Sequence, residues 1–536
     1  MTNIAVARWT GRLAVALQEA LRLSQEAFAE QLGVVPRTVA NWHAQPEREL
    51  RPATKGFLDT LLARADAQAQ RRFAMLAGEG APSLESGNAD DLPTNSGAVA
   101  ALERELSRDP HVGAALAWLD EAAAWTPGMS RREVAQRLAG MERHVIQDRG
   151  NLRSRVTQDE IAGALAGYYG AGHDDYEIYR ARCAGRTVTT SVVTKPDWLD
   201  LRLSLGVGNE RITFAATPEP AMSLDEVGTA AAVQRLAEGV ATNTRIVNAP
   251  LYRLTDIQIG SSLAGVVGLT HFAGYALTLD LLENELVDAV AASHSTRPGA
   301  LPLRDRYLPT LSGVVEVGSR LCVGGVLALC AIARPGRRGH RNGSDYLLLV
   351  QERSGRVLNA ARRLAVIPKA FHEPLVDYRE DAQFFMTLER EMEEELFGRD
   401  DVDSALARQQ GADPMHLSRL SPPMRWLVDH IDGGHWRKEC TAFGYNLVSG
   451  NFECACLIVI DDEEWWERFG GDVAANWESD GLRRYSSADM DTMTSLIHDP
   501  SWSNEGLFAM LQGIRRLSET GGNRVNLPPV ELERAK

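Results

Sequence analysis

The stretch LSQEAFAEQLGVVPRTVANWHAQPE, residues 23–47, has the pattern of two short helices joined by a tight turn. Ser24 is of the type that caps a helix N-terminus, and Phe28 and Leu32 form an apolar stripe at helical spacing. Gly33 follows, where a tight turn needs a residue that readily adopts a positive φ. The stretch therefore predicts a helix-turn-helix.

The second helix of this pair has an inner and an outer face. Val39 and Trp42 have the spacing of core residues. This leaves Arg37, Thr38 and Asn41 on the outer face of a helix whose size suits the major groove of DNA. The alternative to a helix-turn-helix is an ordinary helical hairpin.

Residues 8–66 resemble the Cro/XRE (lambda-repressor-like) family of DNA-binding domains. The resemblance implies that Gln25 contacts a phosphate of double-stranded DNA. It also implies that the outer residues of the second helix read bases, and these are Arg37, Thr38 and Asn41. Such domains usually bind two half-sites as dimers, so we expect a homodimer.

Composition separates this basic region from an acidic remainder. The chain has 536 residues and a net charge of −15, but residues 1–80 hold ten Lys or Arg and eight Asp or Glu. That split favours DNA binding through the N-terminal part alone. No apolar stretch is long enough for a membrane helix, and six cysteines in this length predict no disulfide framework. We expect a cytoplasmic protein without membrane contact.

The length and the local patterns predict a multidomain chain. It combines an all-α helix-turn-helix head, a mixed α+β middle region and an α/β C-terminal domain. The segment GEGAPSLESGNADDLPTNSG is too poor in large apolar residues to pack a core, so it is the best linker candidate. The predicted division is head 1–77, linker 78–97, middle region 98–310, C-terminal domain 311–520 and tail 521–536.

A strongly acidic helix is predicted within LEREMEEELFG, residues 388–398. Glu391, Glu394 and Glu395 have spacings of three and four, which places them on one face of an α-helix. Three close carboxylates are costly unless a cation such as Mg²⁺ lies among them. They are therefore candidate metal ligands and candidate catalytic residues.

Together with Arg390, these glutamates resemble a Nudix box, Arg-Glu-apolar-x-Glu-Glu, with Met392 as the apolar position. The resemblance covers residues 311–520 and implies a Nudix-like α/β domain for a nucleotide-type or other phosphorylated ligand. Arg390 and Lys369 are the implied ligand-binding residues. In an active family member, Mg²⁺ would bridge a diphosphate and activate water.

The resemblance departs from the family pattern in the loop before the box. Lys369 and Ala370 stand in place of two glycines, and Ala382 stands where a glutamate is expected. Phe397 takes the place of the final glycine, which follows as Gly398. Three interpretations stay open: a ligand-binding domain without efficient turnover, an active Mg²⁺-dependent pyrophosphohydrolase, and a plain solvated acidic helix.

The preferred hypothesis is a sequence-specific transcriptional regulator whose C-terminal domain senses a ligand. One alternative is a Nudix-type hydrolase with a DNA-binding head. Another is a DNA-binding interaction or defence-type protein that has no ligand site. The operator, the ligand and the direction of regulation are left open by the residues.

Overall fold

The protein was analysed as a computed structural model, which forms two compact units, Met1–Leu92 and Pro93–Lys536. In the first unit the structure describes residues 9–21, 23–25, 28–29, 36–46, 48, 50, 58, 62 and 73. From residue 95 to residue 533 it describes every position except 171, 221, 243, 245, 337–342, 356, 358–359, 400–413, 431–433 and 477–478.

The N-terminal unit contains helices α1 (Gly11–Leu21) and α3 (Pro36–Ala44). Phe28, Val39 and Trp42 are buried in its core, as predicted. The rings of Phe28 and Trp42 meet edge to face with their centroids 6.5 Å apart. Leu32 and Gly33 of the predicted turn lie outside the described residues.

The linker predicted at residues 78–97 lies outside the described residues up to position 94. Its last three residues already belong to a helix. The described residues from 95 to 169 form five helices: α6 (Asn95–Leu106), α7 (Pro110–Ala122), α8 (Met129–Ala139), α9 (Arg143–Arg155) and α10 (Gln158–Tyr169).

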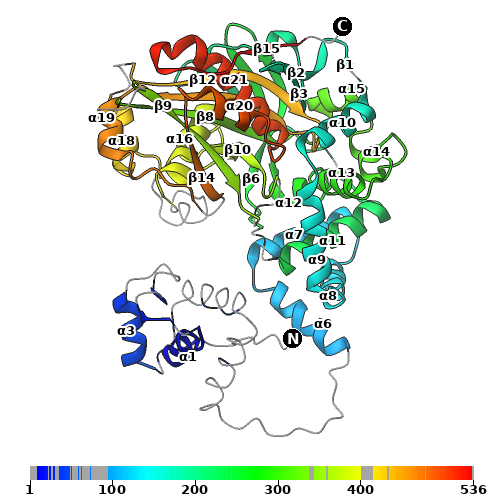
Figure 1. The fold of residues 1–536 in the computed structure, drawn as a ribbon. Coiled ribbons are helices and arrows are strands. Elements are labelled where there is room, and N and C mark those ends of the chain that lie inside the picture. Colours follow the sequence, from blue (N-terminus) through cyan, green and yellow to red (C-terminus); the bar gives the residue numbers. More distant parts are fainter. Residues whose placement is uncertain are drawn as a thin grey trace. The chain divides into compact units, whose positions relative to one another are not determined.

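A large mixed sheet dominates the second unit (Figure 1). Its main path runs β1-β2-β3-β12-β13-β8-β9-β10, and β4, β11, β14 and β15 pair with β12, β8, β9 and β2. The pair β13–β8 is parallel, and the other pairs in this sheet are antiparallel. The strands are β1 (Gly172–His173), β2 (Tyr176–Cys183), β3 (Arg186–Thr194), β4 (Leu203–Ser204), β8 (Gly324–Arg334), β9 (Asp345–Arg353), β10 (Leu364–Val366), β11 (Lys369–Phe371), β12 (Trp436–Asn446), β13 (Phe452–Ile460), β14 (Ser479–Ser486) and β15 (Val530–Leu532).

A smaller sheet has the order β5-β7-β6, in which β5 and β7 are parallel and β6 and β7 antiparallel. Its strands are β5 (Glu210–Phe214), β6 (Pro250–Ile259) and β7 (Leu263–His271). The helical segments in this part of the chain are η1 (Pro196–Trp198), α11 (Glu226–Ala241), α12 (Phe272–Ala276), α13 (Leu281–Ala291), α14 (Pro302–Tyr307), α15 (Leu311–Val315) and η2 (Val317–Ser319).

The boundary predicted between residues 310 and 311 does not divide the structure. Strands β2 and β3 from the middle region continue the sheet of the C-terminal strands, because β3 pairs with β12. Up to residue 533 the predicted tail 521–536 is likewise part of the fold, since β15 pairs with β2. Both predictions were wrong because pairing between distant strands leaves no mark in the local sequence pattern.

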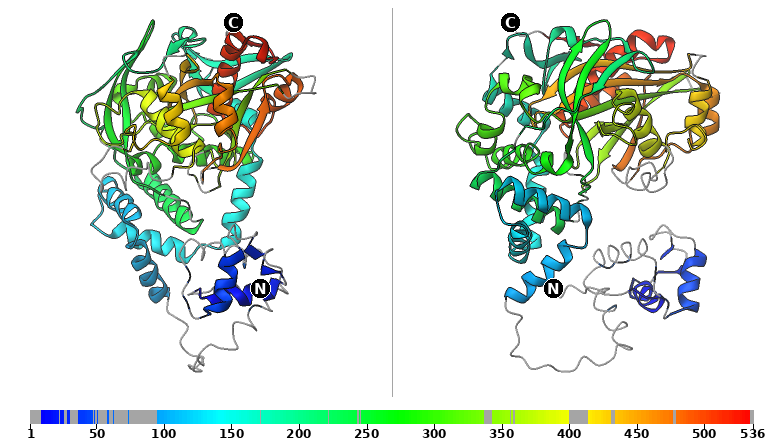
Figure 2. Two further views of the ribbon diagram at one scale, coloured as in Figure 1. Left: turned by 90° about the vertical axis from the view of Figure 1, so that its left-hand side faces the viewer. Right: turned by 180° about the vertical axis from the view of Figure 1, so that it is seen from behind.

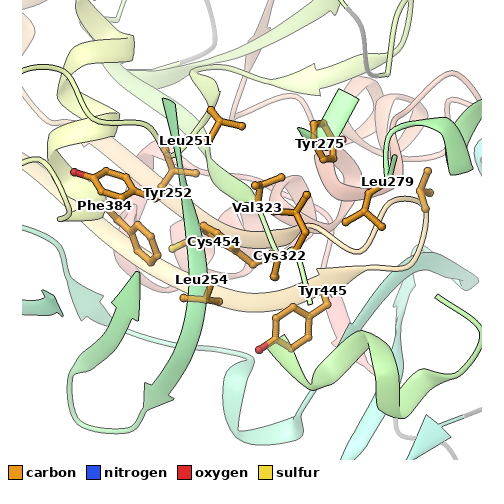
Figure 3. Packing of buried hydrophobic residues seen from close by; sticks show 14 of the residues in the cluster. Leu251, Tyr252, Leu254, Tyr275, Leu279, Cys322, Val323, Phe384, Tyr445 and Cys454 are labelled. Carbon is orange, nitrogen blue, oxygen red and sulfur yellow. The ribbon is translucent and has the colours of Figure 1, made fainter. Parts of the chain in front are cut away.

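The large sheet is buried on both faces, so its inner strands separate two cores. Along β13, side chains alternate between the cores. Cys454 and Cys456 enter one core, whereas Ala455 and Leu457 enter the other. Figure 3 shows part of the first core, where Cys454 lies near Phe384 and Leu254.

Different helices cover the two faces. Helix α21 (Asn504–Thr520) packs on one face, against β13 and β8. Helix α16 (Phe384–Glu391) and the π-helical turn η3 (Met392–Leu396) bury their apolar side chains in the core of the other face. Figure 2 gives two further views of this layered arrangement. The remaining helical segments are α18 (Pro422–Asp429), α19 (Glu463–Phe469), α20 (Met490–Ile497) and η5 (Gly522–Arg524).

Candidate functional site

The residues predicted to contact DNA lie on the surface of the N-terminal unit. Arg37 and Asn41 are exposed on α3, and Thr38 beside them is half-buried. Gln25 is half-buried in the preceding helical segment. Since Val39 occupies the buried side of α3, the helix presents a polar outer face.

The acidic helix does not face solvent. Glu391, Glu393 and Glu395 are buried, whereas Glu389 and Glu394 are partly exposed, with 18% and 20% of their side chains accessible. A plain solvated helix is therefore not what the chain forms here. Burial of this many carboxylates requires partners for each of them.

The predicted grouping of three carboxylates on one face is wrong in detail. The segment after Glu391 is a π-helical turn, which has more residues per turn than an α-helix and so rotates the side chains that follow. Glu391 and Glu394 line a cavity. The side chain of Glu395 instead accepts a hydrogen bond of 2.8 Å from the backbone N–H of Lys369.

Arg390 provides the positive charge beside these carboxylates. It is 4% exposed, and its Nη2 lies 2.8 Å from Glu391 Oε1 and 3.3 Å from Glu373 Oε1. Its Nε lies 4.0 Å from Glu394 Oε1. Burial opposes the charge, but the three carboxylates raise the pKa of Arg390 overall.

This geometry does not fit the predicted magnesium site. The guanidinium of Arg390 already provides the positive charge among the carboxylates. The side chain of Glu395 accepts a hydrogen bond from the backbone of Lys369. Among the described residues, no three His, Cys, Asp or Glu side chains are placed to hold a metal ion. We therefore derive no chemical step through a metal.

The cavity has a volume of about 410 Å³ and is built from segments far apart in the sequence. Residues 247–283 supply one side, through β6, α12 and α13. Other lining residues come from the start of β8, from β11, from the end of α16 and η3, from the turn between β12 and β13, from the start of α21, and from the stretch between Arg353 and Arg363. Leu251 and Tyr275, which line the cavity, also belong to the core drawn in Figure 3.

Two glycines allow the strands at the base of the cavity to approach closely. A Cβ atom on Gly325 would collide with the carbonyl oxygen of Ala370 in β11. A Cβ atom on Gly324 would collide with the backbone of Phe452 in β13. These positions in β8 therefore require glycine, because neither neighbouring backbone can move without breaking the sheet.

A buried ion pair crosses the cavity wall. Lys369 Nζ lies 2.6 Å from Glu505 Oε1, and the two side chains are 10% and 8% exposed. Asn446 donates a hydrogen bond of 3.2 Å to the other oxygen of Glu505. Burial would raise the pKa of Glu505, but the charge of Lys369 outweighs it and lowers the pKa overall. Lys369, which was predicted to bind a ligand, thus lines the cavity with its charge already paired.

Two further carboxyl groups of the lining hold protons more strongly than usual. Burial and the nearby charge of Glu505 raise the pKa of Glu453 to about 8. Burial and Asp280 raise the pKa of Glu283 to about 7. The cavity therefore contains carboxyl groups that change charge near neutral pH.

Local sequence patterns indicated only some of the residues that line this cavity. Glu391, Glu394 and Lys369 were recognised from the acidic helix and the loop before it. Tyr275, Glu283, Asn451, Glu453 and Glu505 were not recognised. One signal was present in the strand FECACLIVI, where Glu453 is the single charged residue in an apolar run. A carboxylate in such a run needs a specific partner.

Set against known proteins, the chain matches no family model and no curated protein. In the described part of the chain, no helix combines the length and the apolar character needed to cross a membrane.

Proposed function

We propose that this protein is a sequence-specific DNA-binding transcriptional regulator whose large unit binds a nucleotide-type or other phosphorylated ligand. The observation that carries the proposal is the cavity of about 410 Å³ on which Glu391, Glu394 and Lys369 converge. Its volume falls in the range of small-molecule sites, about 300–1,000 Å³.

The lining supports a ligand that combines charge with an apolar part. Arg353 and Arg363 contribute cationic groups, which are the usual partners of phosphate. Apolar and aromatic side chains occupy another part of the wall, including Leu251 and Phe272. Arg390 acts as a positioning residue in this proposal, because it holds Glu391 and Glu373 in place.

The N-terminal unit supports DNA binding through the outer face of α3. Arg37 and Asn41 are exposed there, with Thr38 between them, and such side chains make bidentate contacts with guanine and adenine. A single short helix contacts few bases, so we expect a homodimer on two half-sites of double-stranded DNA in the cytoplasm.

A gel-shift experiment with the DNA upstream of the protein's own gene tests the DNA-binding part. We expect specific binding that survives an excess of unrelated competitor DNA. The double variant R37A/N41A should lose the sequence preference. The matched control R48A removes an exposed arginine outside α3, and it should change the salt dependence while keeping the preference.

Calorimetry with the full chain tests the ligand-binding part. The probes are inorganic pyrophosphate and nucleoside diphosphates, each with and without Mg²⁺. We expect binding that is weakened by R363M, which removes a cationic group of the lining, and unchanged by R468M, which removes an exposed arginine on α19. Release of inorganic phosphate in the same samples, abolished by E394Q, would favour the hydrolase alternative. Absence of binding by every probe would contradict the proposal.

A further inference from the structure

One end of the cavity is bordered by three aromatic rings that contact one another. The ring centroids of Phe272 and Tyr275 are 6.1 Å apart, and each lies close to Phe371, at 6.0 and 5.2 Å. All three side chains line the cavity. Tyr275 is buried, whereas Phe272 and Phe371 are half-buried and leave aromatic surface against which a planar ring can pack.

Asn451 lies beside these rings and is 4% exposed. Its Nδ2 donates a hydrogen bond of 3.1 Å to the hydroxyl oxygen of Tyr275. The hydroxyl of Tyr275 in turn donates to Asp280 Oδ1 at 3.4 Å. Because Tyr275 accepts from Asn451, the amide is oriented with its oxygen away from the tyrosine.

The amide oxygen of Asn451 is the feature that calls for a ligand. Within the described part of the chain, Asn451 Oδ1 accepts no hydrogen bond. A buried acceptor without a donor carries a desolvation cost that a bound donor would remove. Asn451 lines the cavity, but its Oδ1 has less than 1 Å² of accessible surface, so its side chain has to turn toward the cavity for a ligand to supply that donor.

Other acceptors accompany Asn451 at this end. Glu283 also lines the cavity, and its carboxylate already accepts a hydrogen bond of 3.3 Å from the backbone N–H of Ala360. Burial, Asp280 and Glu283 together raise the pKa of Tyr275, which shows how near these acidic groups lie. The surroundings therefore favour a ligand group with more than one N–H donor.

We propose that Phe272, Tyr275, Phe371 and Asn451 form a subsite for a planar ring bearing an amino group, of the kind found in nucleobases. The ring packs against the aromatic side chains, and the amino group donates to Asn451 Oδ1. This subsite rests on the proposed function, and it names the part of the ligand that sets specificity. Phe272 and Tyr275 come from a segment that the Nudix resemblance does not cover.

The test uses calorimetry with the full wild-type chain and matched pairs of ligands. Adenosine, guanosine and cytidine diphosphates are each compared with the analogue that lacks the exocyclic amino group. Inorganic pyrophosphate is the probe without a ring. We expect at least one amino-bearing nucleotide to bind more tightly than pyrophosphate. The analogue without the amino group should bind about ten-fold more weakly, as expected when a buried acceptor is left without a donor.

The variant N451L supplies the complementary measurement. It should reduce the affinity for the amino-bearing nucleotide to that for its analogue and leave the affinity for pyrophosphate unchanged. The control N209L makes the same substitution at an exposed asparagine outside the cavity lining. If N451L does not fold, the ligand pairs on the wild-type chain decide the question alone.

The outcomes separate the subsite from the proposed function. Equal affinity within every ligand pair overturns the subsite and leaves ligand binding intact. A folded N451L that binds nucleotides as the wild type does overturns it as well. If no nucleotide and no pyrophosphate binds the wild type, ligand binding by the large unit fails, and the subsite fails with it.

Discussion

Lys369 and Glu505 form a buried ion pair in the cavity wall, and removing one partner leaves the other charge buried alone. We expect K369M to lower the free energy of unfolding by about 3–5 kcal/mol. The control is R468M, which breaks the exposed pair Arg468–Glu464 on α19 and should cost about 1 kcal/mol or less. Urea unfolding measures both, and equal small losses would show that Lys369 is not needed to balance Glu505.

Glu453 gives the large unit a stability that depends on pH. Its pKa is about 8 in the folded chain and 4.5 for an ordinary glutamate, so the folded state binds the extra proton between these values. The stability it contributes is complete below the ordinary pKa and is lost as the pH rises through about 8. The wild type should therefore lose up to about 1.4 kcal/mol per pH unit relative to E453Q across this window. Urea unfolding at several pH values checks this, and parallel curves would refute it.

Helices and strands with clear local patterns could be predicted from the sequence. The capping box of α10 is an example, since the side chain of Thr157 accepts from the backbone of Glu160 and the side chain of Glu160 accepts from Thr157 in return. The apolar runs of strands β8 and β9 can likewise be recognised in the sequence. The pairing of β3 with β12 could not be predicted, because it joins residues about 250 positions apart.

Strand β15 allows a test of whether the end of the chain belongs to the folded core. Val530 in this strand is buried in the core beneath α21. We expect V530D to lower the free energy of unfolding by at least about 2 kcal/mol, because it replaces a buried apolar side chain with a charge. The same change at Val207, which is 89% exposed, should have little effect. Equal stability of the two variants would mean that the end of the chain is a loose tail.

One part of the candidate site could be predicted from the local sequence, whereas the cavity as a whole could not. Glu391 and Glu394 could be found because they lie within four residues of each other on a recognisable helix. The cavity that they line also needs residues from positions 161 to 505, which only the folded chain brings together. The orientation of Glu395 depended on a π-helical turn, and the segment 388–398 has no glycine or proline at that turn to signal it.

A regulator of the proposed kind requires that a ligand in the cavity changes DNA binding by the N-terminal unit. The most direct measurement is the dissociation constant of the full chain for the DNA upstream of its own gene, with and without a saturating nucleotide. We predict a change of about five-fold or more, the usual size of such coupling. In R363M the change should be reduced, while DNA affinity without nucleotide stays that of the wild type. A DNA affinity that no bound nucleotide alters would contradict the proposal.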